Sequence, residues 1–214
     1  MTRVVVAPIV EGDGEVSSLP ILIRRIGQLY CPDSFFDVLK PIRMPASSLI
    51  KADDPCLRRA VGIAEKKLTE CCDSSVRKFV LILLDAEGGC AATLGPQLKQ
   101  RASEIASHLR IACVIAVDEY ETWFVAAAES LTDYLDVNPG EVPSEPETRG
   151  AKKKWIEDRF RSGKYKETVD QPKFSAAMDL RLCRSRSPSF DKLCREIERM
   201  ATPGDAVAVT QRLD

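Results

Sequence analysis

The chain has a single histidine, no cysteine pair at the Cys-x-x-Cys spacing and no long apolar run. The lone His108 disfavours a histidine-based nuclease, and the missing cysteine pairs disfavour a zinc knuckle or a thioredoxin-type site. No stretch approaches the roughly 18 apolar residues that cross a membrane, and no secretory signal follows Met1. We therefore expect a cytoplasmic protein with reduced cysteines and no membrane association.

Length and charge narrow the expectation further. A chain of 214 residues with a hydrophobic fraction of 44% is typical of one globular domain with at most a small appendage. The net charge of −1 hides an asymmetry, because fifteen Lys or Arg residues stand against eight Asp or Glu residues between Arg149 and Met200. This segment indicates either a basic face for a polyanion or a solvated helical surface.

Strand and helix patterns alternate through residues 1–130. The predicted elements are strands at 3–10, 36–43, 78–85 and 111–117, and helices at 15–29, 55–72 and 93–108. Such alternation predicts an α/β fold, a parallel sheet of about four strands with helices on both faces. Residues 131–214 are predicted to form a proline-rich loop and a basic helical C-terminal extension, with helices at 150–161, 173–183 and 188–200.

Three acidic clusters stand where predicted strands end. They are Glu11-Gly12-Asp13-Gly14-Glu15, Asp85-Ala86-Glu87 and Asp118-Glu119-Tyr120-Glu121. The carboxyl ends of parallel strands meet at one crevice, so we expect these carboxylates to lie together. Gathered carboxylates repel one another unless a hard cation lies among them, and Mg²⁺ or Mn²⁺ prefers such oxygen ligands. The sequence therefore predicts a divalent-metal site for phosphate chemistry.

Two other interpretations of the first cluster fit less well. Gly12-x-Gly14 suggests the dinucleotide fingerprint, but Ser17 stands where the third glycine would be. The acidic side chains of the cluster would also repel a pyrophosphate. An EF-hand loop requires alternating ligands across twelve residues, and these are absent.

The acidic motifs carry a family resemblance. A strand ending in Val-Glu-Gly, followed by a helix and a later hydrophobic-Asp-x-acid motif, resembles the Toprim domain of topoisomerases, primases and OLD-type nucleases. More narrowly, the chain resembles a stand-alone Toprim-like family of unknown function, whose members tend to be encoded beside ATPases in bacterial defence loci. The matching motifs are Val10-Glu11-Gly12-x-x-Glu15, Leu84-Asp85-x-Glu87, Glu119-Tyr-Glu121-x-Trp123-Phe124, Ala151-Lys152, Tyr165, Asp170-Gln171-Pro172 and Asp179-Leu180.

This resemblance implies roles for the acidic residues. Glu11 is implied as a metal ligand or general acid–base, and Asp85 and Glu87 as Mg²⁺ ligands. Glu15 is implied near a second ion. Glu87 departs from the family, which more often has Asp at this position. Either Glu119 or Glu121 is expected to complete the metal shell, and Glu121 is favoured.

The basic segment supplies the candidates for binding a phosphate backbone. Lys152 is expected to face a phosphate or to stabilise a transition state, with Lys153 and Lys154 beside it. Tyr165, Arg184 and Arg186 are further candidates of this kind. The alternative interpretation is that each of these lysines, taken alone, is an ordinary surface residue without a binding role.

The predicted function is a metal-dependent nuclease that acts on DNA or RNA, together with an AAA or SMC-like ATPase in anti-phage defence. One ion, held by Glu11 and Asp85 with Glu87 as a further candidate ligand, would activate water. A second ion, near Glu15 and Glu121 and about 4 Å from the first, would stabilise the leaving oxygen. Two alternatives stay open: a catalytically weak subunit that docks on the ATPase and binds nucleic acid, and a nucleotidyl- or phosphotransferase. Formation of a homodimer is also left open.

Overall fold

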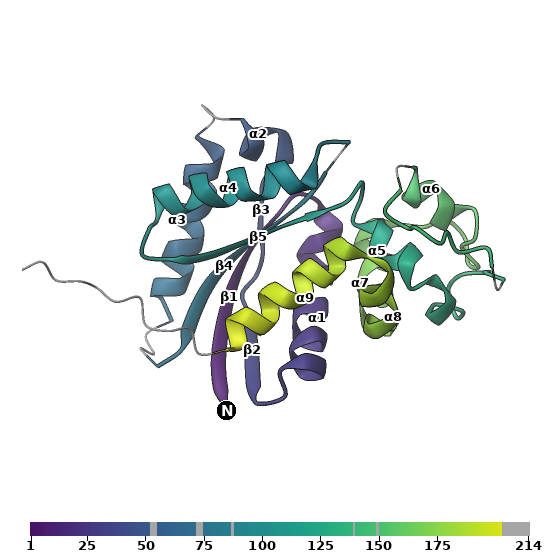
Figure 1. Cartoon of the computed structure of the whole chain (residues 1–214), viewed down its shortest axis with the longest axis horizontal. Coiled ribbons are helices and arrows are strands. Elements are labelled where there is room, and N and C mark those ends of the chain that lie inside the picture. The colour runs from purple at the N-terminus through teal and green to yellow at the C-terminus, as the bar shows by residue number, and fades with distance from the viewer. Residues whose placement is uncertain (52–54, 72–74, 87, 139, 149, 203–214) are drawn as a thin grey trace, which may run out of the picture.

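The computed structural model describes residues 1–51, 55–71, 75–86, 88–138, 140–148 and 150–202. It contains a parallel sheet flanked by helices on both faces (Figure 1), which confirms the predicted fold class. The strands are β1 (Thr2–Val10), β2 (Ser34–Val38), β3 (Ile42–Arg43), β4 (Arg77–Asp85) and β5 (Arg110–Ala116). The α-helices are α1 (Asp13–Tyr30), α2 (Ala46–Ile50), α3 (Cys56–Thr69), α4 (Ala91–Ile105), α5 (Glu121–Ala126), α6 (Lys152–Glu157), α7 (Glu167–Ala177), α8 (Leu180–Arg186) and α9 (Pro188–Ala201), and a 3-10 turn covers Ala128–Ser130.

The strand order is β2-β1-β4-β5, with β3 also pairing with β1, and every pair is parallel. The sheet has five strands where about four were predicted, because the predicted strand at 36–43 is divided into β2 and β3. Pro41 lies in the interruption, and proline has no N–H to donate to a neighbouring strand. Leu39 and Met44 still donate to β1 on either side of this gap, so both halves stay on the same edge of β1.

Side-chain alternation along the strands builds two apolar layers. Val4 and Val6 of β1 face one layer, which α1 and α9 help to form, whereas Val5 and Ala7 face the layer that contains α3 and α4 (Figure 1). Strands buried on both faces read as continuous apolar runs, which is the pattern of β1 and β4.

The C-terminal helices complete the first of these layers. One hydrophobic core contains residues from β1, α1, α5, α7, α8 and α9. Its aromatic contacts cross residue 130, because Phe124 packs edge-on against Phe174 at 5.3 Å between ring centroids and Trp123 packs against Phe190 at 5.3 Å. The segment predicted as an extension therefore supplies part of the packing that holds α1 and α5 in place.

The predicted helix at 173–183 is wrong in its bounds. The chain instead forms α7, which begins and ends earlier, and then α8. Asp179 starts α8 because its side chain accepts hydrogen bonds from the backbone N–H groups of Arg181 and Leu182, the usual action of an aspartate at a helix N-terminus. Among the described residues, none of the helices combines the length and apolar character needed to span a membrane.

We expect Phe174→Ala to lower the free energy of unfolding by about 3–5 kcal/mol, because it empties a fully buried position within the aromatic cluster that joins α7 to α5. Urea denaturation followed by circular dichroism measures this change. The matched control is Phe35→Ala on β2, where the side chain is 53% exposed and the loss should stay within about 0.5 kcal/mol. Equal losses at both positions would contradict the packing described above.

Candidate functional site

The three acidic clusters lie at one edge of the sheet. Glu11 follows β1, Asp85 is the last residue of β4, and Glu121 opens α5 shortly after β5. β4 lies between β1 and β5, and Asp85 is paired with Ala116 at the end of β5. Because the strands are parallel, the three side chains emerge from neighbouring strands at the same carboxyl edge.

Asp85 lies close enough to the other carboxylates for their charges to act on it. Burial raises the pKa of Asp85 well above its usual value, and the charges of Glu15, Glu121 and Glu11 raise it further. The backbone N–H of Tyr120 donates to the Asp85 carboxylate and opposes this shift. The four carboxylates, one of which comes from the first turn of α1, thus share one electrostatic environment.

Glu15 lies on α1 with its carboxylate folded back over Gly12. A Cβ atom at position 12 would lie 2.3 Å from Glu15 Oε2, so this close approach requires glycine. Burial raises the pKa of Glu15 to about 7; backbone N–H groups of Glu15 and Gly12 oppose the shift, and the charge of Glu121 adds to it. Glu15 Oε2 is buried and accepts no hydrogen bond among the described residues. This oxygen is therefore available to a cation.

Glu121 is held by two neutral donors. Its Oε1 accepts hydrogen bonds from the Tyr165 hydroxyl and from Gln171 Nε2, each at 3.0 Å. Burial raises the pKa of Glu121, although both hydrogen bonds favour its charged form. The two donors come from the C-terminal segment and orient this carboxylate without a cationic side chain.

Gln171 reaches Glu121 across the start of α1. Its side-chain amide packs directly over Gly14, where a Cβ atom would lie 2.1 Å from Gln171 Oε1. That same oxygen accepts a hydrogen bond from the Ser18 hydroxyl at 3.4 Å. Gly14 thus allows α7 to approach α1 closely enough for Gln171 to reach the acidic residues.

Asp118 and Glu119 act on the backbone of the loop that leads into α6. Asp118 has a left-handed φ of 70°, and its Oδ2 accepts a hydrogen bond from the Gly150 N–H at 2.8 Å. Glu119 Oε2 accepts from the Lys153 N–H at 2.9 Å. Of the two candidates for the metal shell, Glu121 therefore lies with the other carboxylates, whereas Glu119 is occupied by α6.

The structure buries Lys152, which the sequence offered as a phosphate-facing cation. The residue is 7% exposed. Its ammonium group donates to the carbonyls of Thr148 and Gly150 and lies 3.5 Å from Asp118 Oδ2. In this arrangement Lys152 fastens the loop before α6 to the end of β5, and it does not present its charge to solvent.

The other predicted nucleic-acid contacts are also engaged within the protein. Lys153 pairs with Glu167, and Lys154 pairs with Asp158. Arg184 donates to Asp191 and Glu198 with its guanidinium over the ring of Tyr30, and Arg186 pairs with Glu129. The hydrogen bond to Glu167 is the main cause that raises the pKa of Lys153. The charge of Glu121 raises this pKa further, which places Lys153 near the acidic residues. Lys153 is thus a partly exposed cation beside the acidic residues.

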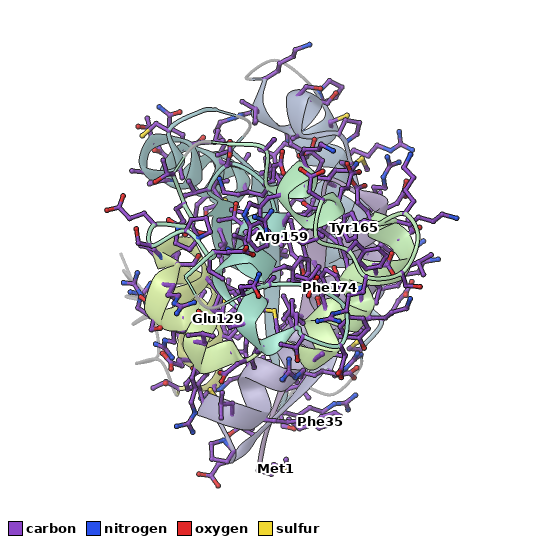
Figure 2. All side chains as sticks on the ribbon, turned by 90° about the vertical axis from the view of Figure 1, so that its right-hand side faces the viewer. Met1, Phe35, Glu129, Arg159, Tyr165 and Phe174 are labelled. Atoms are coloured by element: carbon purple, nitrogen blue, oxygen red, sulfur yellow. The ribbon has the colours of Figure 1, made fainter. Side chains whose placement is uncertain are left out.

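Tyr165 belongs to the interior. Its ring stacks on Phe174 at 5.8 Å between centroids, and Figure 2 shows the two residues close together in the C-terminal part. Burial raises the pKa of its phenol, and the neighbouring charge of Glu121 raises it further. The hydroxyl therefore stays protonated as a donor to Glu121 instead of facing a nucleic acid.

Glu87, the remaining predicted ligand, lies outside the described residues. Within the described ranges, no three His, Cys, Asp or Glu side chains form a ready-made ion-binding group. The acidic residues are brought near one another, and closing them around an ion requires side-chain movement or Glu87.

Gln171 and Ser18 were not among the predicted site residues. Gln171 belongs to the motif Asp170-Gln171-Pro172. Only the resemblance of this motif to the Toprim-like family singled the residue out in the sequence. A glutamine within a helix has no spacing pattern that marks it as a partner of a carboxylate 50 positions away. Only the packing of α7 on α1 brings it there.

A scan against protein-family models matches residues 10–198 to a family described as a domain of unknown function, DUF4276. The chain belongs to this family. A search of solved structures finds the C-terminal region of the Burkholderia pseudomallei OLD protein, at 12% identity and a TM-score of 0.39, covering 94% of this chain and 100% of that chain. The search of curated proteins finds no match.

The raised pKa of Glu15 predicts a pH-dependent stability. Between about pH 4.5 and pH 7 the folded chain keeps a proton on Glu15 that the unfolded chain has lost. The contribution of Glu15 to the free energy of unfolding therefore falls as pH rises through this interval, by about 3 kcal/mol in total. Urea denaturation in a chelating buffer at pH 5 and pH 8 should show this decrease reduced in Glu15→Gln. The exposed control Glu104→Gln should keep the wild-type decrease, and an unchanged decrease in Glu15→Gln would contradict the assignment.

Gly14→Ala should displace the Gln171 amide and destabilise the protein by about 1–3 kcal/mol, because the added methyl group overlaps a buried side chain. The control is Gly62→Ala on α3, where an added Cβ meets nothing within 4 Å. That substitution should instead stabilise the helix by about 0.5–1 kcal/mol. Urea denaturation curves of both variants measure the change in the free energy of unfolding, which should have opposite signs. A stabilising Gly14→Ala would contradict the close approach of the Gln171 amide to Gly14.

Proposed function

We propose that this protein is a divalent-metal-dependent nuclease that hydrolyses phosphodiester bonds of DNA or RNA. The observation that carries the proposal is the convergence of Glu11, Glu15, Asp85 and Glu121 at the carboxyl edge of a parallel sheet. Three of these residues have raised pKa values, mainly because burial disfavours their charged forms, and neighbouring carboxylates add to the shift at Glu15 and Asp85. Strongly perturbed carboxylates in such a position are typical of functional sites.

The donor set suits Mg²⁺ or Mn²⁺. All four side chains offer carboxylate oxygens, the ligands that these hard cations prefer, and Glu15 Oε2 has no hydrogen-bond donor among the described residues. Glu11 and Asp85 would hold the ion, with Glu15 and Glu121 beside it and Glu87 as a further proposed ligand. A bound divalent ion supplies neutralisation of the phosphate charge and activation of water.

The surrounding residues keep this acidic set in order. Tyr165 and Gln171 orient the Glu121 carboxylate, and the Tyr120 N–H holds Asp85. Lys153, with its side chain 46% exposed, would meet a substrate phosphate more readily than the buried Lys152. At neutral pH Glu15 is poised between its charged and protonated forms, so it can accept a proton from a group that approaches it.

The proposed biological role and partner depend on the motif resemblance. A role in anti-phage defence, and an AAA or SMC-like ATPase as partner, are part of the proposal because the acidic motifs resemble those of proteins encoded beside such ATPases. The likeness extends to the Toprim domain of OLD-type nucleases, whose chemistry is the one proposed.

We expect plasmid, single-stranded DNA or tRNA to be cleaved in Mn²⁺ or Mg²⁺, and EDTA to abolish the cleavage. Glu11→Gln and Asp85→Asn should each lower the rate by about a hundredfold or more, because each removes a charge that binds the ion or handles a proton. Glu104→Gln on α4 should keep the wild-type rate. A second readout is the melting temperature at pH 8, which Mn²⁺ should raise in the wild type and not in Asp85→Asn.

The same experiment separates the alternatives. Intact polymers together with no Mn²⁺-dependent rise in melting temperature, even when the neighbouring ATPase is added, would disprove the nuclease and favour a docking subunit. Metal binding with turnover of a small nucleotide and no polymer cleavage would favour a nucleotidyl- or phosphotransferase.

A further inference from the structure

A cavity of about 550 Å³ lies beside the carboxylate edge, between α4 and α9 along the outer strand β5. β5 pairs only with β4 among the described strands, and both helices pack against it (Figure 1). Cys113, Ile115 and Val117 line the cavity from β5 and the residues after it, at the alternate positions that share one face of a strand. Ala91 and Ala92 contribute a wall of small side chains at the start of α4. The cavity thus has an apolar floor and extends to the carboxyl end of β5.

Cations from both helices surround this cavity. Lys99 reaches it from α4, and Lys192 and Arg195 reach it from α9. Burial raises the pKa of the Cys113 thiol to about 12, and the charges of Lys192 and Lys99 both oppose that shift, so both lysines lie near the floor. The ammonium group of Lys99 has no ion pair or hydrogen bond within the described residues. It is therefore a cation without an internal partner at the mouth of an apolar cavity.

Carboxylates of α9 pair with both α9 cations, and Lys99 is left unpaired among the described residues. Glu196 is shared between Lys192 and Arg199. Glu147, which lines the cavity, accepts hydrogen bonds from the Ser187 hydroxyl and the Ser189 N–H at the start of α9. Glu147 is thus held at the start of α9. Arg195 Nε pairs with Asp191 at 2.9 Å, so Arg195 keeps only its terminal amino groups for an external anion, whereas Lys99 has no ion pair among the described residues.

Size and chemistry together indicate the class of ligand. A cavity of about 550 Å³ lies in the range that holds a small molecule on an apolar surface with a few polar contacts. Lys99 on one wall and the terminal amino groups of Arg195 on the other suit a multiply charged anion such as a phosphate. We propose that this cavity binds a nucleotide unit, with its phosphate between Lys99 and the α9 cations and its sugar and base against β5.

Two kinds of ligand would supply this nucleotide unit. It is either a free nucleoside phosphate or the end of a nucleic-acid strand whose next phosphodiester lies at the carboxylates. Val117 directly follows β5 and Ala91 begins α4 after the loop that follows Asp85, so the cavity lies toward the same carboxyl end of the sheet as the acidic residues. The second source rests on the proposed nuclease function, whereas the first does not.

Isothermal titration in EDTA with two probes, ADP and a 5′-phosphorylated DNA hexamer, tests the site without any cleavage. We expect saturable binding of at least one probe, weakened roughly tenfold or more by Lys99→Glu because a charge-assisted contact is reversed. Ala92→Trp, which fills the cavity and leaves its cations in place, should weaken binding as much. The matched control Arg58→Glu reverses an exposed charge on α3 and should bind as the wild type does, and Ala92→Ser should also bind normally.

Each outcome decides the proposal. Binding of ADP alone assigns a free nucleotide, and binding of the hexamer alone assigns a strand end. Binding of neither probe, or binding that Ala92→Trp in a folded state leaves unchanged, would overturn the site. Displacement of either probe by an equal concentration of hexaglutamate would also overturn it, in favour of an acidic protein partner. Because no metal is present, failure of the nuclease and failure of this site are measured separately.

Discussion

Mutual repulsion among four carboxylates is the constraint around which this molecule is arranged. Glu11, Glu15, Asp85 and Glu121 are held near one another by parallel strand ends and the first turn of α1. Burial, the largest cause of the raised pKa values of Glu15, Asp85 and Glu121, makes those three charges harder to maintain. A fold keeps such a set only if its core supplies enough stability to offset the strain. Here two apolar layers on either side of the sheet supply it.

The C-terminal helices have a double role in this arrangement. They complete one apolar layer, and α7 with the residues just before it brings Gln171 and Tyr165 to the Glu121 carboxylate. The donors are neutral, so they orient the carboxylate without pairing its charge with a side-chain cation. This segment thus supports the acidic site with neutral hydrogen-bond donors and with apolar packing. Many of its surface charges lie in ion pairs, including Lys153, which pairs with Glu167 and is a partly exposed cation beside the site.

The parallel sheet and the positions of Glu11 and Asp85 could be predicted because both depend on local patterns. An apolar run followed by a carboxylate and glycine marks a strand end, and parallel connections bring such ends to one edge. The split between β2 and β3 was missed, although Pro41 was a visible signal for it. Lys152 was predicted to face a phosphate, and nothing in a run of three lysines distinguishes the one that is buried beside Asp118.

The amino-acid pattern by itself determined the order of strands and helices, the acidic strand ends and the oxygen chemistry that these share. Those properties follow from neighbours along the chain, because side-chain periodicity and turn residues act over a few positions. Tertiary structure alone decided that Gln171 lies over Gly14, that Tyr165 donates to Glu121, and that Lys99 faces α9 across a cavity. These contacts join residues far apart in the chain, and their existence depends on how helices pack, which local propensity does not specify.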